Sequence, residues 1–179
     1  PLLNYTIEKL EEAGEVDDVF VVVNDRFYDK FAEWLEENKS KFNKNIELIN
    51  DGTRDNEERL GGVKDLELVL DEKKIDDDIL VLAGDSLFDF YLSDMAEFFK
   101  EKKVVINAAY ELDSLEKAKR FGVLELDENN MIRSFEEKPS EPKSKTISLA
   151  CYIFPKDKID YIKRYAGSEK SKEGPGHLI

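Results

Sequence analysis

Residues 79–89 read Ile79-Leu80-Val81-Leu82-Ala83-Gly84-Asp85-Ser86-Leu87-Phe88-Asp89 and decide the fold class. The apolar run 79–83 has the length and composition of a strand buried on both faces, as in a parallel sheet covered by helices. The run stops at Gly84-Asp85, and open α/β sheets bind ligands beyond the carboxyl ends of their strands. Asp85 is therefore a candidate metal ligand. Gly-Asp after a strand is also ordinary turn chemistry, so a purely structural turn is the alternative.

Helical and strand patterns alternate on both sides of this strand. Apolar spacing predicts helices near 3–14, 25–35, 60–70, 93–99, 113–120 and 155–165, and strands at 19–23, 46–49, 104–110 and 147–154. Such alternation predicts an α/β fold of the Rossmann-like three-layer α/β/α type, with a mostly parallel mixed sheet. Residues 122–127 and 131–135 alternate apolar and polar positions around Glu128-Asn129-Asn130, which predicts a β-hairpin.

Composition limits the classes of partner. The chain has 179 residues, 41% hydrophobic and 38% charged, which fits one globular domain with a real core. Its net charge of −14 argues against nucleic acid and anionic membranes as partners. No run is long enough to cross a bilayer and no signal peptide is evident, which favours the cytoplasm. The single Cys151 has apolar neighbours, so we expect a buried hydrophobe rather than a nucleophile.

The loop 51–62 is a second candidate site. It runs into a predicted helix start, where free backbone N–H groups favour anions or base edges. A solvated loop with a helix cap is the alternative. Paired glycines cost helix stability, so a close approach by a ligand or by backbone explains Gly61-Gly62 better than chance.

Two further stretches are candidate sites. Phe121-Gly122 joins a short helix to the hairpin, and a helix-ending glycine cap explains it without function. The run 135–139 reads Phe-Glu-Glu-Lys-Pro, so Glu137 offers an acceptor for hydroxyl groups and Lys138 a donor for phosphate. A charged edge strand that ends at a proline is the alternative.

In order and spacing, these stretches resemble the sugar-1-phosphate nucleotidyltransferases, with the closest likeness to the glucose-1-phosphate thymidylyltransferase type. The resemblance covers essentially the whole chain and rests on Asn50–Gly52 with Asn56–Gly61, Leu82–Asp85, Ala118–Val123 and Phe135–Pro139. It implies one nucleotidyltransferase domain over residues 1–179, which transfers a nucleotidyl group from an NTP to a sugar-1-phosphate. The products are an NDP-sugar and pyrophosphate, the expected substrates are dTTP and glucose-1-phosphate, and the cofactor is Mg²⁺.

The resemblance also implies roles for single residues on the nucleotide side. Leu60, Gly61 and Gly84 match positions beside the nucleotide, and Asp85 matches one of two aspartates that hold the catalytic Mg²⁺. A net-acidic protein needs such a cation to bring two anionic substrates together.

On the sugar side, the hairpin matches the family's sugar-binding insertion. Gly122 matches a backbone contact to the sugar, Glu137 a carboxylate that binds sugar hydroxyl groups, and Lys138 the catalytic ammonium that binds the sugar phosphate.

The chain also departs from the family pattern. The first strand with its Gly-rich loop and the second metal-binding aspartate have no counterpart here, so we expect a domain truncated at both ends with little activity of its own. Ser86 replaces an asparagine, and Leu149-Ala150 replaces Thr-Gly beside the sugar, which leaves the sugar open. A non-catalytic sugar-nucleotide-binding or regulatory subunit is the main alternative, and an acidic receiver-like signalling domain is a third. The sequence also leaves a homo-oligomer open.

Overall fold

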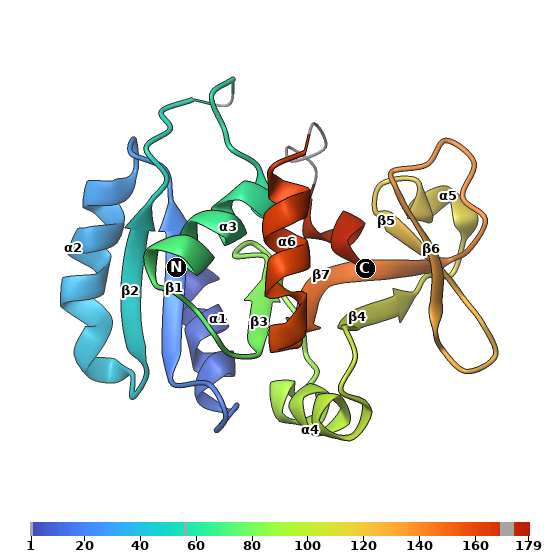
Figure 1. Ribbon diagram of the computed structural model, residues 1–179, viewed down its shortest axis with the longest axis horizontal. Helices are drawn as coiled ribbons and strands as arrows, with labels where there is room; N and C mark the ends of the chain where they lie inside the picture. Colours follow the sequence, from blue (N-terminus) through green and yellow to red (C-terminus); the bar gives the residue numbers. More distant parts are fainter. Residues whose placement is uncertain (1, 56, 169–173) are drawn as a thin grey trace.

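The computed structural model describes residues 2–55, 57–168 and 174–179, so Asn56 of the sequence motif lies outside the described residues (Figure 1). The helices are α1 (Leu2–Glu11), α2 (Tyr28–Asn38), α3 (Gly62–Glu72), α4 (Leu92–Lys102), α5 (Leu115–Ala118) and α6 (Ile159–Ala166), with short 3-10 turns η1 (Lys39–Lys41), η2 (Lys156–Lys158) and η3 (Pro175–Leu178). The strands are β1 (Asp18–Val23), β2 (Asn45–Asn50), β3 (Ile79–Leu82), β4 (Ile106–Glu111), β5 (Gly122–Leu126), β6 (Ile132–Glu137) and β7 (Thr146–Phe154).

All predicted strands are present, and local backbone geometry explains the shifted boundaries. Helix α3 begins at Gly62 because Gly61 has φ 92°, outside the helical region. Strand β4 begins at Ile106 rather than at residue 104, after Lys103 ends α4 in the left-handed conformation. Helix α5 is shorter than predicted and starts at the Ser114 side chain, which accepts a hydrogen bond from the Lys117 N–H.

The strands form two hydrogen-bonded sheets among the described residues. Strands β1 and β2 are parallel and pair from Asp18↔Asn45 to Val23↔Asn50. Strand β7 is antiparallel to β3, β4 and β5, and β5 forms the predicted hairpin with β6. The α/β class is confirmed, but the expectation of mostly parallel pairing is wrong in detail, because β7 runs back between β3 and β4.

Two apolar cores confirm the three-layer arrangement. Alternate residues of β3 and β7 point to opposite sides, so Leu82 and Ile153 belong to one core and Val81 and Phe154 to the other. Helices α1 and α4 close the first core, while α3 and α6 close the second (Figure 1). The sheets therefore lie between two helical layers, as the Rossmann-like prediction requires.

The packing of β3 differs from the expectation of full burial. All of its residues are only half-buried. The described residues contribute no strand to the second edge of β3 or of β1. Strand β3 therefore has a strand neighbour on one side only, and we attribute its partial exposure to this uncovered edge.

The prediction for Cys151 is confirmed. Cys151 is 2% exposed and packs in the first core, and burial raises the pKa of its thiol to about 12. Within the described residues, every helix is too short or too polar to span a bilayer.

Candidate functional site

The turn after β3 carries the first candidate residue. The Ser86 N–H donates to the Ala83 carbonyl over 3.3 Å, so Gly84-Asp85 is a turn, as the structural alternative predicted. The Ala83 N–H donates to the Ala150 carbonyl over 3.0 Å and anchors this turn to β7. Asp85 is exposed, and none of the hydrogen bonds or ion pairs between described residues uses its carboxylate. The turn therefore presents a carboxylate with both oxygens available to a ligand.

A metal ion bound by Asp85 would need further oxygen ligands. The described residues contain no group of three or more His, Cys, Asp or Glu side chains that could hold a metal ion. Mg²⁺ is commonly held by one or two carboxylates together with water and substrate phosphates, so a lone accessible aspartate fits a site that a nucleotide completes.

A cavity of about 340 Å³ lies at the start of α3. Its lining residues are Asp51, Arg59, Leu60, Gly61, Gly62, Asp65 and Gly174. The predicted nucleotide residues Leu60 and Gly61 are thus brought together, whereas Gly84 is not among the lining residues. We call this cavity the nucleotide pocket, after the prediction that Leu60 and Gly61 lie beside a nucleotide.

Local hydrogen bonds shape the loop that enters the pocket. The Asp51 carboxylate accepts from both the N–H and the hydroxyl of Thr53, each over 2.8 Å. The Thr53 carbonyl in turn accepts from the Asp25 N–H over 2.9 Å, and Arg54 Nε contacts Asp25 over 2.9 Å. The polar loop is therefore held by side chain to backbone bonds rather than by solvent alone.

The predicted sugar residues come together at the end of the hairpin. Gly122 lies opposite Glu137 in the β5–β6 register, and the Lys138 N–H donates to the Phe121 carbonyl over 3.0 Å. Lys138 has φ 48°, and its Nζ lies 3.4 Å from Glu137 Oε1. Both charged side chains are exposed. The hairpin therefore presents an ammonium and a carboxylate next to each other, as the resemblance implies.

A segment that the sequence did not identify joins these two regions. Gly174-Pro175-Gly176-His177, which we call the bridging segment, contributes Gly174 to the nucleotide pocket. A Cβ atom on Gly62 would lie 3.0 Å from Pro175 Cδ. At the other end of the segment, a Cβ atom on Gly176 would lie 2.3 Å from the Phe135 ring.

The Phe135 ring completes this link. It packs between Gly122 and Gly176, since a Cβ atom on Gly122 would lie 2.4 Å from the same ring. The His177 ring meets it edge to face, with ring centroids 5.0 Å apart. We gave His177 no role from sequence, and the only local signal was the Gly-Pro-Gly run before it.

A partly buried polar cluster on β4 and β7 was also missed. Asn107 Nδ2 donates to Ser148 Oγ over 3.0 Å and to the Cys151 carbonyl over 3.1 Å, and Ser148 Oγ lies 3.1 Å from the Tyr152 hydroxyl. Burial raises the pKa of Tyr152, and the charge of Glu137 adds to this rise. The end of the hairpin is therefore electrostatically coupled to the middle of β7.

Comparison with known proteins supports the fold and identifies the family. Glucose-1-phosphate adenylyltransferase of Mycoplasma mobile is 45% identical over 75 residues, which are 42% of this chain and 20% of that protein. A structure assigned as a glucose-1-phosphate thymidylyltransferase from Bacillus anthracis, in complex with sucrose, matches with a TM-score of 0.78 at 22% identity. The match covers 96% of this chain and 65% of that one.

A second structure, apo UDP-glucose pyrophosphorylase, matches with a TM-score of 0.70 at 17% identity, over 92% of this chain and 68% of that one. The two structures support the fold, and the chain spans only part of the length of each relative. The model of the nucleotidyl transferase family matches residues 1–176. The chain belongs to the nucleotidyl transferase family.

Proposed function

We propose that the protein transfers a nucleotidyl group from a nucleoside triphosphate to a sugar-1-phosphate. The observation that carries this proposal is the bridging segment, which contacts the nucleotide pocket at Gly62 and the Gly122–Phe135 contact of the hairpin. The nucleotide pocket and the end of the hairpin are thereby fixed relative to each other. A transferase that joins two substrates needs this, because fixed relative positions lower the entropic cost of their reaction.

The residues present suit the two substrates. On the nucleotide side, the backbone at Gly61 leaves room for a base to approach beside Leu60. On the sugar side, Lys138 binds the sugar phosphate and Glu137 accepts hydrogen bonds from sugar hydroxyl groups. The space that a side chain of Gly122 would occupy is filled by the Phe135 ring, so a sugar can meet only the backbone polar groups of Gly122. An oxygen of the sugar phosphate attacks the α-phosphorus, and the bond from that phosphorus to the pyrophosphate oxygen breaks.

Charge neutralisation is the main demand of this reaction, because two anions must meet at the α-phosphorus. Lys138 supplies one positive charge, and Asp85 with the triphosphate oxygens would hold Mg²⁺. When bound, Mg²⁺ offsets the charge that develops on the phosphate oxygens.

The finer assignment of substrates combines the resemblance with one relative. The resemblance favours glucose-1-phosphate with dTTP, and the Mycoplasma mobile relative is named for glucose-1-phosphate with an adenylyl group. We therefore propose glucose-1-phosphate as the sugar substrate. The cytoplasmic location, the absence of nucleic-acid and membrane partners, a homo-oligomer, the single domain over residues 1–179 and the low activity of this chain alone stay predictions.

Pyrophosphate release by the full-length protein tests the activity. With Mg²⁺ and glucose-1-phosphate, we expect release with at least one of ATP, GTP, CTP, UTP and dTTP. The Asp85→Asn variant should lose at least about 100-fold, because one charged contact at a transferring phosphate is commonly worth that much. Asp89→Asn is the matched control, since Asp89 is also exposed and lies only a few residues further along the same loop.

Absence of release with every nucleotide and any sugar phosphate would contradict the transferase function. Tight binding of an NDP-sugar without turnover would instead favour the non-catalytic subunit. The third reading, a receiver-like signalling domain, is wrong, because the chain belongs to the nucleotidyl transferase family.

A further inference from the structure

Strand β7 contains a bulge where it pairs with β4. The paired positions on either side of the bulge are Asn107↔Tyr152 and Ala109↔Ser148. Residues 149–151 of β7 therefore lie opposite a single residue of β4. Within the bulge, Ala150 has φ 51°, a left-handed conformation that is unfavourable for a residue with a Cβ atom. A straight strand would avoid this cost, and bulges often lie next to active sites, where they redirect the chain.

One side chain of β4 spans this bulge. Asn107 Nδ2 donates to Ser148 Oγ over 3.0 Å at the start of the bulge and to the Cys151 carbonyl over 3.1 Å at its end. The Ala150 N–H donates to the same Ser148 Oγ over 3.3 Å. Asn107 Oδ1 is enclosed and has no hydrogen-bond partner among the described residues. The side chain therefore acts on the bulge through its two N–H donors.

The bulge is bonded directly to the turn that carries Asp85. The Ala150 carbonyl accepts from the Ala83 N–H over 3.0 Å. The Ala83 carbonyl accepts in turn from the Ser86 N–H over 3.3 Å, which closes the turn around Asp85. A change in the position of Ala150 is therefore transmitted to the backbone of the metal-binding candidate.

The other end of the bulge lies beside the sugar end of the hairpin. Ile147, which precedes Ser148, pairs with Val123 of β5. Val123 follows Gly122, and Gly122 pairs with Glu137. Figure 1 shows β7 running from the hairpin to β3. The shape of β7 between residues 147 and 150 therefore sets the separation of the Asp85 turn from Glu137.

We propose that Asn107 is a positioning residue, which holds the bulge of β7 and so fixes the turn that carries Asp85 relative to Glu137. A purely structural role for Asn107 is the alternative, since partly buried polar groups need hydrogen-bond partners in any fold. That role accounts for the two hydrogen bonds but not for the left-handed Ala150, which a straight strand would not need. The inference rests on the proposed function, which assigns Asp85 to the metal and Glu137 to the sugar.

Amide hydrogen exchange in the full-length protein tests the structural part of the proposal without any ligand. Asn107→Leu keeps a side chain of similar size and removes both donors. We compare the exchange rate of the Ala83 N–H with the rates of amides in the β1–β2 sheet, which has no hydrogen-bonded strand in common with β7. This ratio should rise at least about tenfold in the variant. Equal acceleration of both sets of amides would indicate a general loss of stability and would overturn positioning.

Steady-state kinetics tests the catalytic part. The kcat of Asn107→Leu should fall by about 10- to 100-fold, because small misplacements of catalytic groups have effects of this size. The KM for the nucleotide should stay within about twofold, since the residues that line the nucleotide pocket do not belong to the bulge. A raised KM with an unchanged kcat would indicate lost binding and would overturn the proposal.

A second variant decides the question if Asn107→Leu does not fold. Ser148→Ala removes the oxygen that accepts from Asn107, and it should raise the exchange ratio in the same direction. The double variant should raise the ratio by less than the two single effects combined, because both act through one hydrogen bond.

Asn38→Leu is the matched control. Asn38 is 7% exposed and its Nδ2 donates to the Trp34 carbonyl over 2.7 Å, so the control also removes an enclosed amide donor. It lies at the end of α2, which packs against β2 rather than β7. This variant should not raise the exchange ratio and should keep the kcat of the wild type.

The remaining outcomes separate the two proposals. An exchange ratio unchanged in both Asn107→Leu and Ser148→Ala would overturn the role of Asn107 and leave the transferase function intact. A raised ratio with the kcat of the wild type would also overturn it, because the bulge would then hold the turn without any effect on the reaction. Absence of turnover in the wild-type protein would overturn the proposed function, whereas the exchange ratio would still support or overturn the link between Asn107 and the Asp85 turn.

Discussion

The contact between Gly176 and Phe135 makes a strong prediction about stability. Substitution of Gly176 by alanine places a methyl group where the structure has 2.3 Å to Phe135 Cζ, 2.7 Å to Cε2 and 3.0 Å to Cε1. These distances are far below van der Waals contact. Movement of the ring is restricted, because an added Cβ atom on Gly122 would lie at a similarly short distance from it.

The magnitude follows from two opposing effects. Overpacking of a filled site costs about 1–3 kcal/mol. Replacing glycine by alanine also restricts the unfolded chain and returns about 0.4–1 kcal/mol. We expect Gly176→Ala to lower the free energy of unfolding by about 1.5 kcal/mol, as measured by urea denaturation of the full-length protein.

Two variants make this measurement decisive. Gly174→Ala is the matched control from the same segment, since an added Cβ there meets nothing within 4 Å, and it should change stability by less than about 0.5 kcal/mol. Phe135→Leu removes the atoms that clash, so the double variant should be more stable than the sum of the two single effects by about 1 kcal/mol. Strict additivity, or a neutral Gly176→Ala, would refute the idea that Phe135 links the hairpin to the bridging segment.

Three further predictions concern single side chains. The pKa of Asp65 is raised from 3.8 to about 6, so between these two pH values the native state holds the carboxyl proton more tightly than the unfolded chain does. The free energy of unfolding therefore falls as the pH rises through this interval. At pH 7.5, Asp65→Asn should therefore have a free energy of unfolding about 1 kcal/mol higher than wild type, a value already reduced for the solvent in the cavity. At pH 4 the two proteins should be about equally stable in urea titrations. A difference that does not change with pH would contradict this prediction. Lys138→Met should raise the KM for the sugar phosphate by about 10- to 100-fold, because in the proposed function this side chain binds that phosphate. The melting temperature should stay unchanged, since the side chain is exposed and its ion pair with Glu137 is a surface pair. Lys143→Met is the control, and an equal effect there would point to general charge. Ala150→Gly should raise the free energy of unfolding by about 0.5 kcal/mol in denaturant titrations. Ala150 has φ 51°, a left-handed conformation that is less favourable for a residue with a Cβ atom than for glycine. Clear destabilisation would show that the packing of its methyl group matters more.

Local patterns were sufficient to predict much of the site. The alternation of residues 122–127 and 131–135 correctly predicted a hairpin, but its register, which pairs Gly122 with Glu137, also depends on a bulge near Glu125 that the pattern does not show. The apolar run at 79–83 correctly predicted a strand with a core on each face. Periodicity does not state which strand lies next to which, and for this reason the antiparallel course of β7 was not expected.

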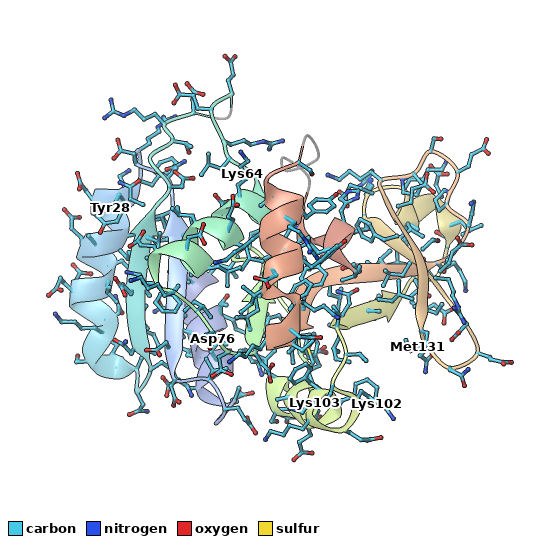
Figure 2. All side chains as sticks on the ribbon, in the orientation of Figure 1. Tyr28, Lys64, Asp76, Lys102, Lys103 and Met131 are labelled. Carbon is cyan, nitrogen blue, oxygen red and sulfur yellow. The ribbon has the colours of Figure 1, made fainter. Side chains whose placement is uncertain are left out.

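The missed features all depend on contacts between distant parts of the chain. Asp65 looked like an ordinary acid in the first turn of a helix, and only the cavity reveals that its Oδ1 lacks a partner. Gly176 and Phe135 lie some 40 residues apart, so no local spacing links them. Figure 2 shows the side chains on the ribbon, with Lys64, in the first turn of α3, above Asp76, in the loop that follows this helix.

The half-buried β3 and its neighbour β1 have a consequence for handling the protein. Each has one edge that no described strand covers. Unpaired N–H and C=O groups along a strand form a template on which another chain can add, which leads to aggregation. The net charge of −14 opposes this by mutual repulsion. We expect the isolated 179-residue chain to stay dispersed in dilute buffer at low ionic strength and to self-associate when salt screens that charge.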